Sequence, residues 1–170
     1  MKGLSLVVFL ITVSLGIAVF LATSKKTVFP ILKKPSESPL KTETPRDPSL
    51  KKLQVGDTFV WVKICQTDEE KRQGLSGVKS MAEDEGMLFV YNTAAAYKFW
   101  MKDMNFSLDF IWIREGEVVD LSENVPVFDE DGEITRVRPG RLVDQILEVN
   151  SGFIEKNNIG VGDKVSLIEN

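Results

Sequence analysis

The placement of prolines divides the chain into three parts. Five of its seven prolines lie between Lys25 and Lys52, mixed with Lys, Ser, Thr and Glu. A stretch of this composition cannot bury a core, so residues 25–52 are predicted to form an extended, disordered tether. Residues 1–24 form a separate hydrophobic segment. We therefore expect one compact domain at residues 53–170. The apolar content of the whole chain is 43%, which leaves enough for a core once the other two parts are subtracted.

The hydrophobic segment resembles a membrane anchor. Leu4–Ala22 is 19 residues without a charge, and a helix of that length about matches the thickness of a bilayer core. A cleaved signal peptide is the alternative, although Ala22 and Ser24 form only a marginal cleavage site. We expect an uncleaved anchor at residues 4–22.

Two features of the sequence favour opposite orientations of this anchor. Lys25 and Lys26 follow the apolar run and favour the cytoplasmic side. A short positive N-terminus before an apolar run is instead the layout of an export signal. We expect the domain to lie outside the cytoplasm, with secretion after cleavage or a cytoplasm-facing domain as alternatives.

Charge is distributed unevenly between the tether and the domain. Residues 25–52 hold eight basic and three acidic side chains, a net charge of +5, whereas residues 53–170 hold 12 basic and 22 acidic ones, a net charge of −10. The acidic domain would repel nucleic-acid phosphates, so no nucleic-acid partner is expected. The basic tether could attract anionic lipid or a cell-wall polymer.

The composition excludes several kinds of catalytic site. The chain has no histidine, and Cys65 is its single cysteine. Ser-His-Asp and Cys-His catalysis, zinc sites and an intramolecular disulfide are therefore excluded, and we expect neither a metal nor a cofactor. The acidic run Asp129–Glu133 lacks the length of a calcium-binding loop and is better explained as an Asp-Gly turn.

The domain shows the pattern of a mainly β fold. Phe59–Cys65 alternates apolar and polar residues, as a half-buried strand does. Thr67 and Glu70 predict a capping box for a short helix ending at Gly74, and Ser151 is predicted to cap a second helix through Asn158, ended by Gly160. Further strands are expected near residues 86–91, 97–102, 108–113, 117–121, 134–138, 144–150 and 164–168. This pattern predicts an antiparallel sandwich or barrel-like domain with two short helices.

Four segments carry a family resemblance: TDEEKRQGLSG (67–77), DEGMLFVY (84–91), FWMKDMNFSLDFIWI (99–113) and LEVNSGFIEKNNIGVGDKV (147–165). In order and spacing, residues 53–170 resemble domain-of-unknown-function family 192. The resemblance implies a mostly β, sandwich-like fold, often in exported proteins, and no agreed activity. Val78 stands where the family often has Arg, Ser107 stands where it usually has Pro, and residues 125–139 match loosely.

Asp109 and Glu148 are the most suggestive acidic residues. Asp is disfavoured in strands, yet Asp109 opens one, on the face of Ile111 and Ile113. It either accepts turn amides, pairs with Lys102 or serves a ligand. Glu148 and Asn150 precede the predicted second helix, where free amides could help to fix an anion. Asp109 and Glu148 are also the one pair that we would nominate for two-carboxylate catalysis.

Aromatic and basic residues complete the candidate ligand-binding set. Trp100 and Lys102 would lie on one strand face and together make a platform for a sugar or another flat ligand. If residues 97–102 and 108–113 form a hairpin, Asp109 faces Met101 or Trp100, with Lys102 near it. Core packing is the alternative for Trp100. Arg72 either pairs with Asp68 or Glu69 of its own helix or serves a substrate.

The leading functional hypothesis is a membrane-tethered domain that binds a small molecule, a glycan or a protein and requires no catalysis. It would use a face around Trp100, Lys102, Asp109 and Glu148. The first alternative is a carboxylate-dependent hydrolase of envelope polysaccharide, which needs Asp109 and Glu148 to face one cleft. The second is a structural or assembly module without a ligand pocket.

Overall fold

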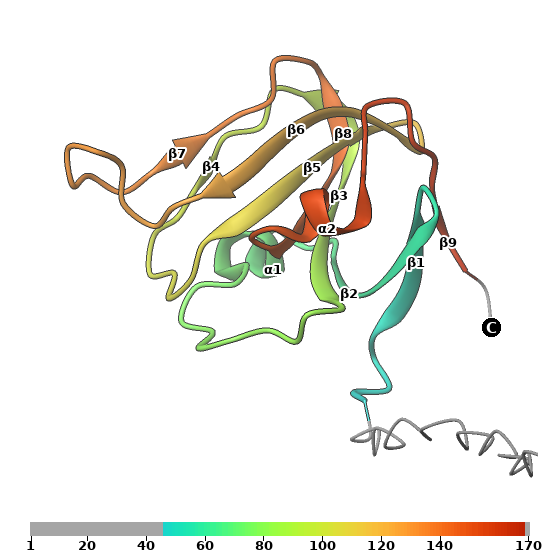
Figure 1. Ribbon diagram of the computed structural model, residues 1–170, viewed down its shortest axis with the longest axis horizontal. Coiled ribbons are helices and arrows are strands. Elements are labelled where there is room, and N and C mark those ends of the chain that lie inside the picture. Colours follow the sequence, from blue (N-terminus) through green and yellow to red (C-terminus); the bar gives the residue numbers. More distant parts are fainter. Residues whose placement is uncertain (1–45, 169–170) are drawn as a thin grey trace, which may run out of the picture. The chain divides into compact units, whose positions relative to one another are not determined.

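The computed structural model describes residues 46–168, which contain nine strands and two short helices (Figure 1). In chain order they are β1 (Lys51–Val55), β2 (Thr58–Cys65), α1 (Asp68–Gln73), β3 (Glu85–Ala95), β4 (Phe99–Trp100), β5 (Leu108–Arg114), β6 (Glu117–Val125), β7 (Arg136–Val137), β8 (Val143–Asn150), α2 (Phe153–Asn157) and β9 (Val165–Leu167). The predicted anchor at residues 4–22 lies outside the described residues. Within residues 46–168, neither helix has the length and apolar character that a bilayer crossing requires.

Seven strands form one curled sheet in the order β6-β5-β8-β3-β2-β1-β9. All neighbours in it are antiparallel except β2 and β3, which are parallel and are connected through α1. The two edges of the sheet approach each other where Glu117 bridges Lys164 and the Val118 amide donates to the Asp163 carbonyl. The prediction of a mainly β fold is confirmed, but the sheet is a mixed half-barrel and not a purely antiparallel one.

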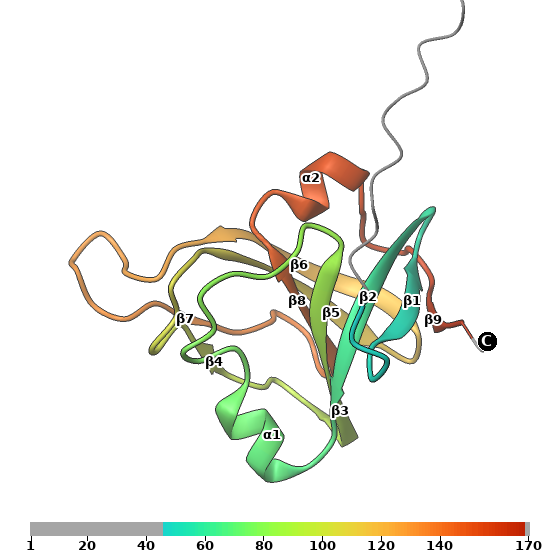
Figure 2. The same ribbon diagram turned by 90° about the horizontal axis from the view of Figure 1, so that it is seen from below.

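The sheet is buried on both faces because two apolar clusters cover it. Strand β5 shows this directly: Phe110 and Trp112 belong to the cluster on one face, and Ile111 and Ile113 belong to the cluster on the other. The sequence of a strand that is buried on both faces is a nearly continuous apolar run, and β5 has such a sequence. Helix α2 packs into the Ile111 cluster, and α1 and α2 lie on opposite sides of the sheet (Figure 2).

The remaining strands form a two-stranded ribbon that covers the Phe110 cluster. Strand β4 pairs with β7, so that Phe99 is opposite Val137 and Trp100 is opposite Arg136. The predicted hairpin of residues 97–102 with 108–113 is therefore wrong. Strand β5 instead lies between β6 and β8. Both of its faces are apolar, and an interior position in the main sheet buries both of them.

The two helices begin differently. Thr67 forms the predicted capping box, since its hydroxyl accepts from the Glu70 amide at 3.2 Å and the Glu70 carboxylate accepts from the Thr67 amide at 3.0 Å. The predicted Ser151 cap is wrong. Gly152 is the N-cap of α2 at φ 83°, without a side-chain cap, and the Ser151 hydroxyl bonds to the Asn124 side chain.

The start of the domain and the acidic loop also take defined forms. Strand β1 begins at Lys51, two residues inside the segment predicted as tether, because it pairs with β2 and β9.

In the loop before β7, the Asp129 carboxylate accepts from the amides of Asp131 and Glu133, as in an acidic turn. Within residues 46–168, no group of three or more acidic or cysteine side chains is placed to hold a metal ion.

Candidate functional site

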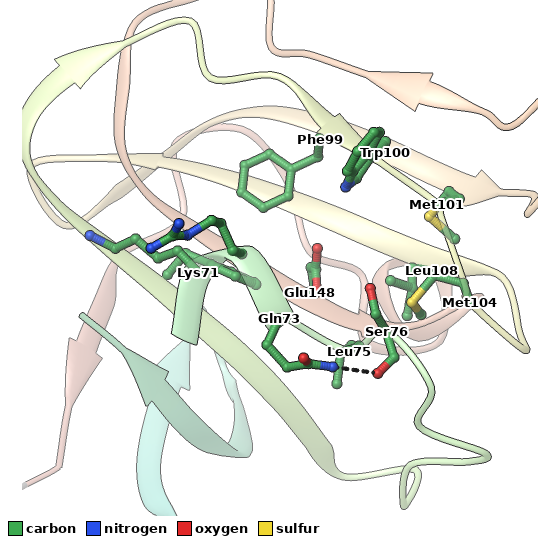
Figure 3. Close-up of a pocket in the computed structure, with 13 residues that line it drawn as sticks. Lys71, Gln73, Leu75, Ser76, Phe99, Trp100, Met101, Met104, Leu108 and Glu148 are labelled. Carbon is green, nitrogen blue, oxygen red and sulfur yellow. Dashed lines mark hydrogen bonds between the residues drawn. The ribbon is translucent and has the colours of Figure 1, made fainter. Parts of the chain in front are cut away.

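A small cavity opens on the side of the sheet that carries α1. Its walls come from the end of α1 and the following loop, from β4 and from Met104, and Glu148 of β8 lies within it (Figure 3). The cavity volume is about 40 Å³, which is room for a group of hydroxymethyl size. Three segments that are distant in the sequence therefore meet at one carboxyl group.

Hydrogen bonds tie the walls of this cavity together. Gln73 donates from Nε2 to the Ser76 carbonyl at 2.9 Å (Figure 3). The Ser76 hydroxyl donates to the Lys102 carbonyl at 3.1 Å. The Gly77 amide donates to the Asp103 carbonyl at 2.8 Å. The loop after α1 and the segment after β4 are thus fixed against each other, and the cavity is largely pre-formed.

Glu148 is a buried carboxyl group without a partner. It is 6% exposed and lies in β8 between two apolar neighbours, Leu147 and Val149. Its side chain makes no hydrogen bond or ion pair within residues 46–168. Figure 3 shows the carboxyl group between Gln73 and Ser76 on one side and Phe99 and Trp100 on the other. Its oxygens are not among the fully enclosed polar atoms that lack a partner, so they face the open space of the cavity. A buried acid without a protein partner destabilises a fold, so its presence requires a reason.

Burial determines the protonation state of Glu148. Loss of solvation disfavours the charged form and raises the pKa of Glu148 from 4.5 to about 8. The group is therefore largely protonated at neutral pH, when it both donates and accepts hydrogen bonds. Strong pKa perturbation in a cavity marks a candidate functional residue.

The backbone beside Glu148 is packed unusually closely. Strand β3 passes Glu148 at Gly86, where an added Cβ would lie 2.8 Å from the Glu148 carbonyl oxygen. It would also lie 3.1 Å from the Val149 side chain. Only glycine fits such an approach. Gly86 thereby holds β3 against β8 next to the buried carboxyl group.

Trp100 lies at the rim of the cavity. Its side chain is 55% exposed although it lines the same cavity as Glu148. The Lys102 ammonium lies 5.3 Å from the centroid of the indole ring. An exposed indole beside a cation is suited to the face of a flat or cyclic ligand.

Asp109 lies on the other face of the sheet. It is fully buried, pairs in register with Val149, and is adjacent to Phe110, which pairs with Glu148. Its Oδ1 accepts from the Asn124 amide at 2.7 Å, and its Oδ2 accepts from the Ile154 amide at 3.0 Å. The carboxyl group of Asp109 thus fastens α2 and the end of β6 to β5. Because Asp109 and Glu148 are on opposite faces, they do not form a two-carboxylate catalytic pair, and that prediction is wrong.

The buried Cys65 and the neighbouring Tyr91 both stay protonated at neutral pH. Burial raises the pKa of the Cys65 thiol to about 11 and the pKa of Tyr91 to about 12. Cys65 is 1% exposed. A buried, protonated thiol is a poor nucleophile, so Cys65 has a structural role.

Comparison with known proteins establishes the family. Residues 51–167, more than half of the chain, match the family DUF192, described as "Uncharacterized ACR". The chain belongs to the DUF192 family. No protein with a curated function matches it closely. The predicted family resemblance is confirmed.

Two crystal structures share the DUF192 fold seen here. One is of a proposed transcription regulator from Sinorhizobium meliloti, with a TM-score of 0.63 and 22% identity, over 69% of this chain and 93% of that chain. The other is of a protein of unknown function from Novosphingobium aromaticivorans, with a TM-score of 0.62 and 24% identity, over 69% and 84%. At such identities the likeness shows the fold alone.

The DUF192 domain brings together three of the predicted site residues. Arg72, Trp100 and Glu148 line one cavity. Arg72 makes no ion pair with Asp68 or Glu69, and its Nε donates instead to the Asp68 carbonyl at 3.0 Å. Lys102 lies just outside, over Trp100. Asn150 points elsewhere and donates to the carbonyls of Met81 and Ala82.

The sequence patterns did not identify the other polar residues of the cavity or the two arginines at β7. Gln73 and Ser76 lie in the QGLSG segment, whose turn signals place it after a helix but do not say what it faces. Arg136 and Arg138 flank Val137 in the pattern RVR, and this alternation was a usable signal for two basic side chains on one strand face.

Proposed function

We propose that this DUF192 domain is a membrane-tethered binding module, located outside the cytoplasm, for a small neutral saccharide or polyol. The observation that carries the proposal is the unpartnered carboxyl group of Glu148, 6% exposed and facing a cavity. In the bound state a ligand hydroxyl group would replace the missing hydrogen bonds of this carboxyl group. The tether and the anchor would hold the module at the membrane surface.

The protonation state of Glu148 favours a hydroxyl group as its partner. Because its pKa is raised to about 8, the neutral acid offers one donor and one acceptor, as a hydroxyl group does. Lys71 and Arg72 also line the cavity. The charged group of Lys71 points away from Glu148 (Figure 3), but two positive charges near the entrance disfavour an ammonium group on the ligand. A cationic ligand therefore fits this site less well than a neutral one.

The dimensions of the site favour a ligand that enters by one group. A volume of about 40 Å³ admits a hydroxymethyl-sized substituent, whereas a whole sugar ring needs more room. The ring itself would remain outside, against the exposed indole of Trp100. This arrangement would bury one polar group and stack one apolar ring face.

The same cavity gives little support for acid-base hydrolysis. Glu148 is the one carboxyl group among the described residues that line it. Glycoside hydrolysis by the usual route requires two carboxyl groups across one cleft. Binding without turnover is the function that the geometry supports best.

Ligand-induced thermal stabilisation tests the proposal. The full chain in neutral detergent is heated with glucose, N-acetylglucosamine or glycerol at neutral pH. We expect at least one of the two sugars to raise the unfolding temperature, since a ligand that binds only the folded state stabilises it. Glycerol, which offers a hydroxymethyl group without a ring, is expected to stabilise less.

Two substitutions at Glu148 make the test specific. Glu148→Gln keeps a neutral donor and acceptor and should retain stabilisation by the sugar, whereas Glu148→Met fills the space without either and should lose it. Trp100→Ala should weaken the effect of the sugars but not that of glycerol. Equal stabilisation of the Met variant and the native chain, or no stabilisation by any of the three compounds, would contradict the proposal.

A further inference from the structure

The outer face of the β4–β7 ribbon carries a cluster of basic side chains around Trp100. The register places Trp100 opposite Arg136, with Phe99 and Val137 facing the core, so the next outward pair is Lys98 and Arg138. Lys98, Arg136, Arg138 and Trp100 are all exposed. Figure 1 shows β4 and β7 side by side, away from β1 and β9.

These basic side chains are not neutralised within the part of the chain that the structure describes. Lys98, Arg136 and Arg138 make no ion pair there, although residues 53–170 carry a net charge of −10. The acidic loop 129–133 lies next to β7 in sequence, yet its carboxylates make no ion pair with the ribbon among the described residues. Three cations without an ion-pair partner on one small face create a local positive potential on a domain that is acidic overall.

The cations border a shallow hollow. It is lined by Lys98, Arg136, Val137 and Arg138 and has a volume of about 270 Å³. Neighbouring outward residues on one strand are about 7 Å apart, and those on paired strands are about 5 Å apart. A ligand one or two sugar rings long would therefore reach Trp100 and two of the cations at once.

We infer that this face, the basic ribbon (Lys98, Trp100, Arg136 and Arg138), binds an acidic polysaccharide whose sugar rings carry carboxylate groups. The guanidinium fork of arginine matches a carboxylate through two parallel hydrogen bonds. The indole of Trp100 stacks on the apolar face of a sugar ring. Because the carboxylate is attached directly to the sugar ring, the ring can stack on Trp100 while the carboxylate reaches a neighbouring arginine. The basic ribbon shares Trp100 with the rim of the Glu148 cavity, but its cations lie outside that cavity, and the inference does not require a ligand at Glu148.

A nucleic acid shares part of this chemistry but fits the domain less well. Its phosphates are spaced along a long chain, which would extend beyond the basic ribbon onto a surface that is acidic overall. A short uronic-acid oligomer needs only the ribbon. The export-like layout of the N-terminus also favours a partner outside the cytoplasm.

Titration of the full chain in neutral detergent with oligogalacturonate tests the inference. We expect saturable binding that weakens steeply as salt is added, because exposed ion pairs are screened. The double substitution Arg136→Ala and Arg138→Ala should weaken binding by about a hundredfold, and Trp100→Ala by about tenfold. Dextran, which is neutral, should not bind at this surface.

Matched variants and probes separate this surface from general charge effects. Lys51→Ala with Lys79→Ala removes the same charge at exposed positions elsewhere and should leave affinity within about threefold. Glu148→Met should also leave it unchanged, so failure of the cavity proposal would not affect the result. Equal loss in the two double variants would overturn the inference. Binding of polyglutamate or of a thymidine oligomer as tightly as oligogalacturonate would also overturn it, in favour of charge alone or of nucleic acid.

Discussion

The Glu148→Gln variant is expected to be more stable than the native chain near pH 9, by on the order of 5 kcal/mol, and about equally stable near pH 4. The cause is the pKa of Glu148, which burial raises from 4.5 in the unfolded chain to about 8 in the folded one. Between these two values the folded state binds a proton that the unfolded state has released. Stability of the native chain therefore falls as the pH rises through this window and levels off above it. Glutamine does not titrate and removes this dependence.

Chemical denaturation at a series of pH values measures this effect. Glu123→Gln is the matched control, because Glu123 is exposed and its substitution removes the same charge from the surface. The control should keep the pH dependence of the native chain. If the free energy of unfolding depends on pH in the same way for the native chain and for Glu148→Gln, then Glu148 is not the group whose pKa burial raises.

The second large effect is expected at Asp109. Asp109→Ala should lower the free energy of unfolding by about 3–5 kcal/mol. The substitution removes the acceptor of the Asn124 and Ile154 amides, at 2.7 Å and 3.0 Å, and leaves both donors without a partner. Asp109→Asn keeps one acceptor and should lose about half as much. Denaturation midpoints report the loss, and faster amide exchange at Ile154 would locate it at α2.

Two comparisons distinguish a structural role of Asp109 from a role in binding. Asp57→Ala, at an exposed position, should change stability by less than about 0.5 kcal/mol. Asp109→Asn should still be stabilised by the sugar that stabilises the native chain, because Asp109 faces away from the cavity. A stable Asp109→Asn variant that no longer responds to the sugar would contradict the structural role.

Local features of the fold were predictable because they depend on neighbours in the sequence. The Thr67 capping box is one example, since both of its hydrogen bonds join residues three apart. The continuous apolar run of β5 is another. Ser151 shows the limit of this reasoning, because Gly152 at positive φ begins α2 and frees the serine for Asn124.

The pairing of strands was not predictable from the same patterns. Strand β4 pairs with β7, whose residues are more than thirty positions later in the chain, and alternation does not specify a partner. For the same reason the sequence could not show that Asp109 and Glu148 face opposite ways. Each lies among apolar residues, but their relative orientation depends on the register of Phe110 with Glu148.

The cavity itself depends on this long-range pairing. Its polar wall comes from the loop after α1, its aromatic wall from β4 and its carboxyl group from β8. The sequence identified Trp100 and Glu148 as candidates but assigned them to one face with Asp109. Burial of Glu148 without a partner is a property of the assembled fold.

An NMR titration of the Glu148 side-chain carboxyl carbon in the full chain tests directly whether this group binds the ligand. It is performed without ligand and with the sugar that gives the larger thermal stabilisation. We expect a midpoint near the pKa of about 8 in the free chain. Added sugar should raise this midpoint, because the ligand excludes water and favours the neutral acid. A midpoint near the ordinary value of 4.5, or one that added sugar leaves unchanged, would contradict the assignment of Glu148 as the ligand-binding group.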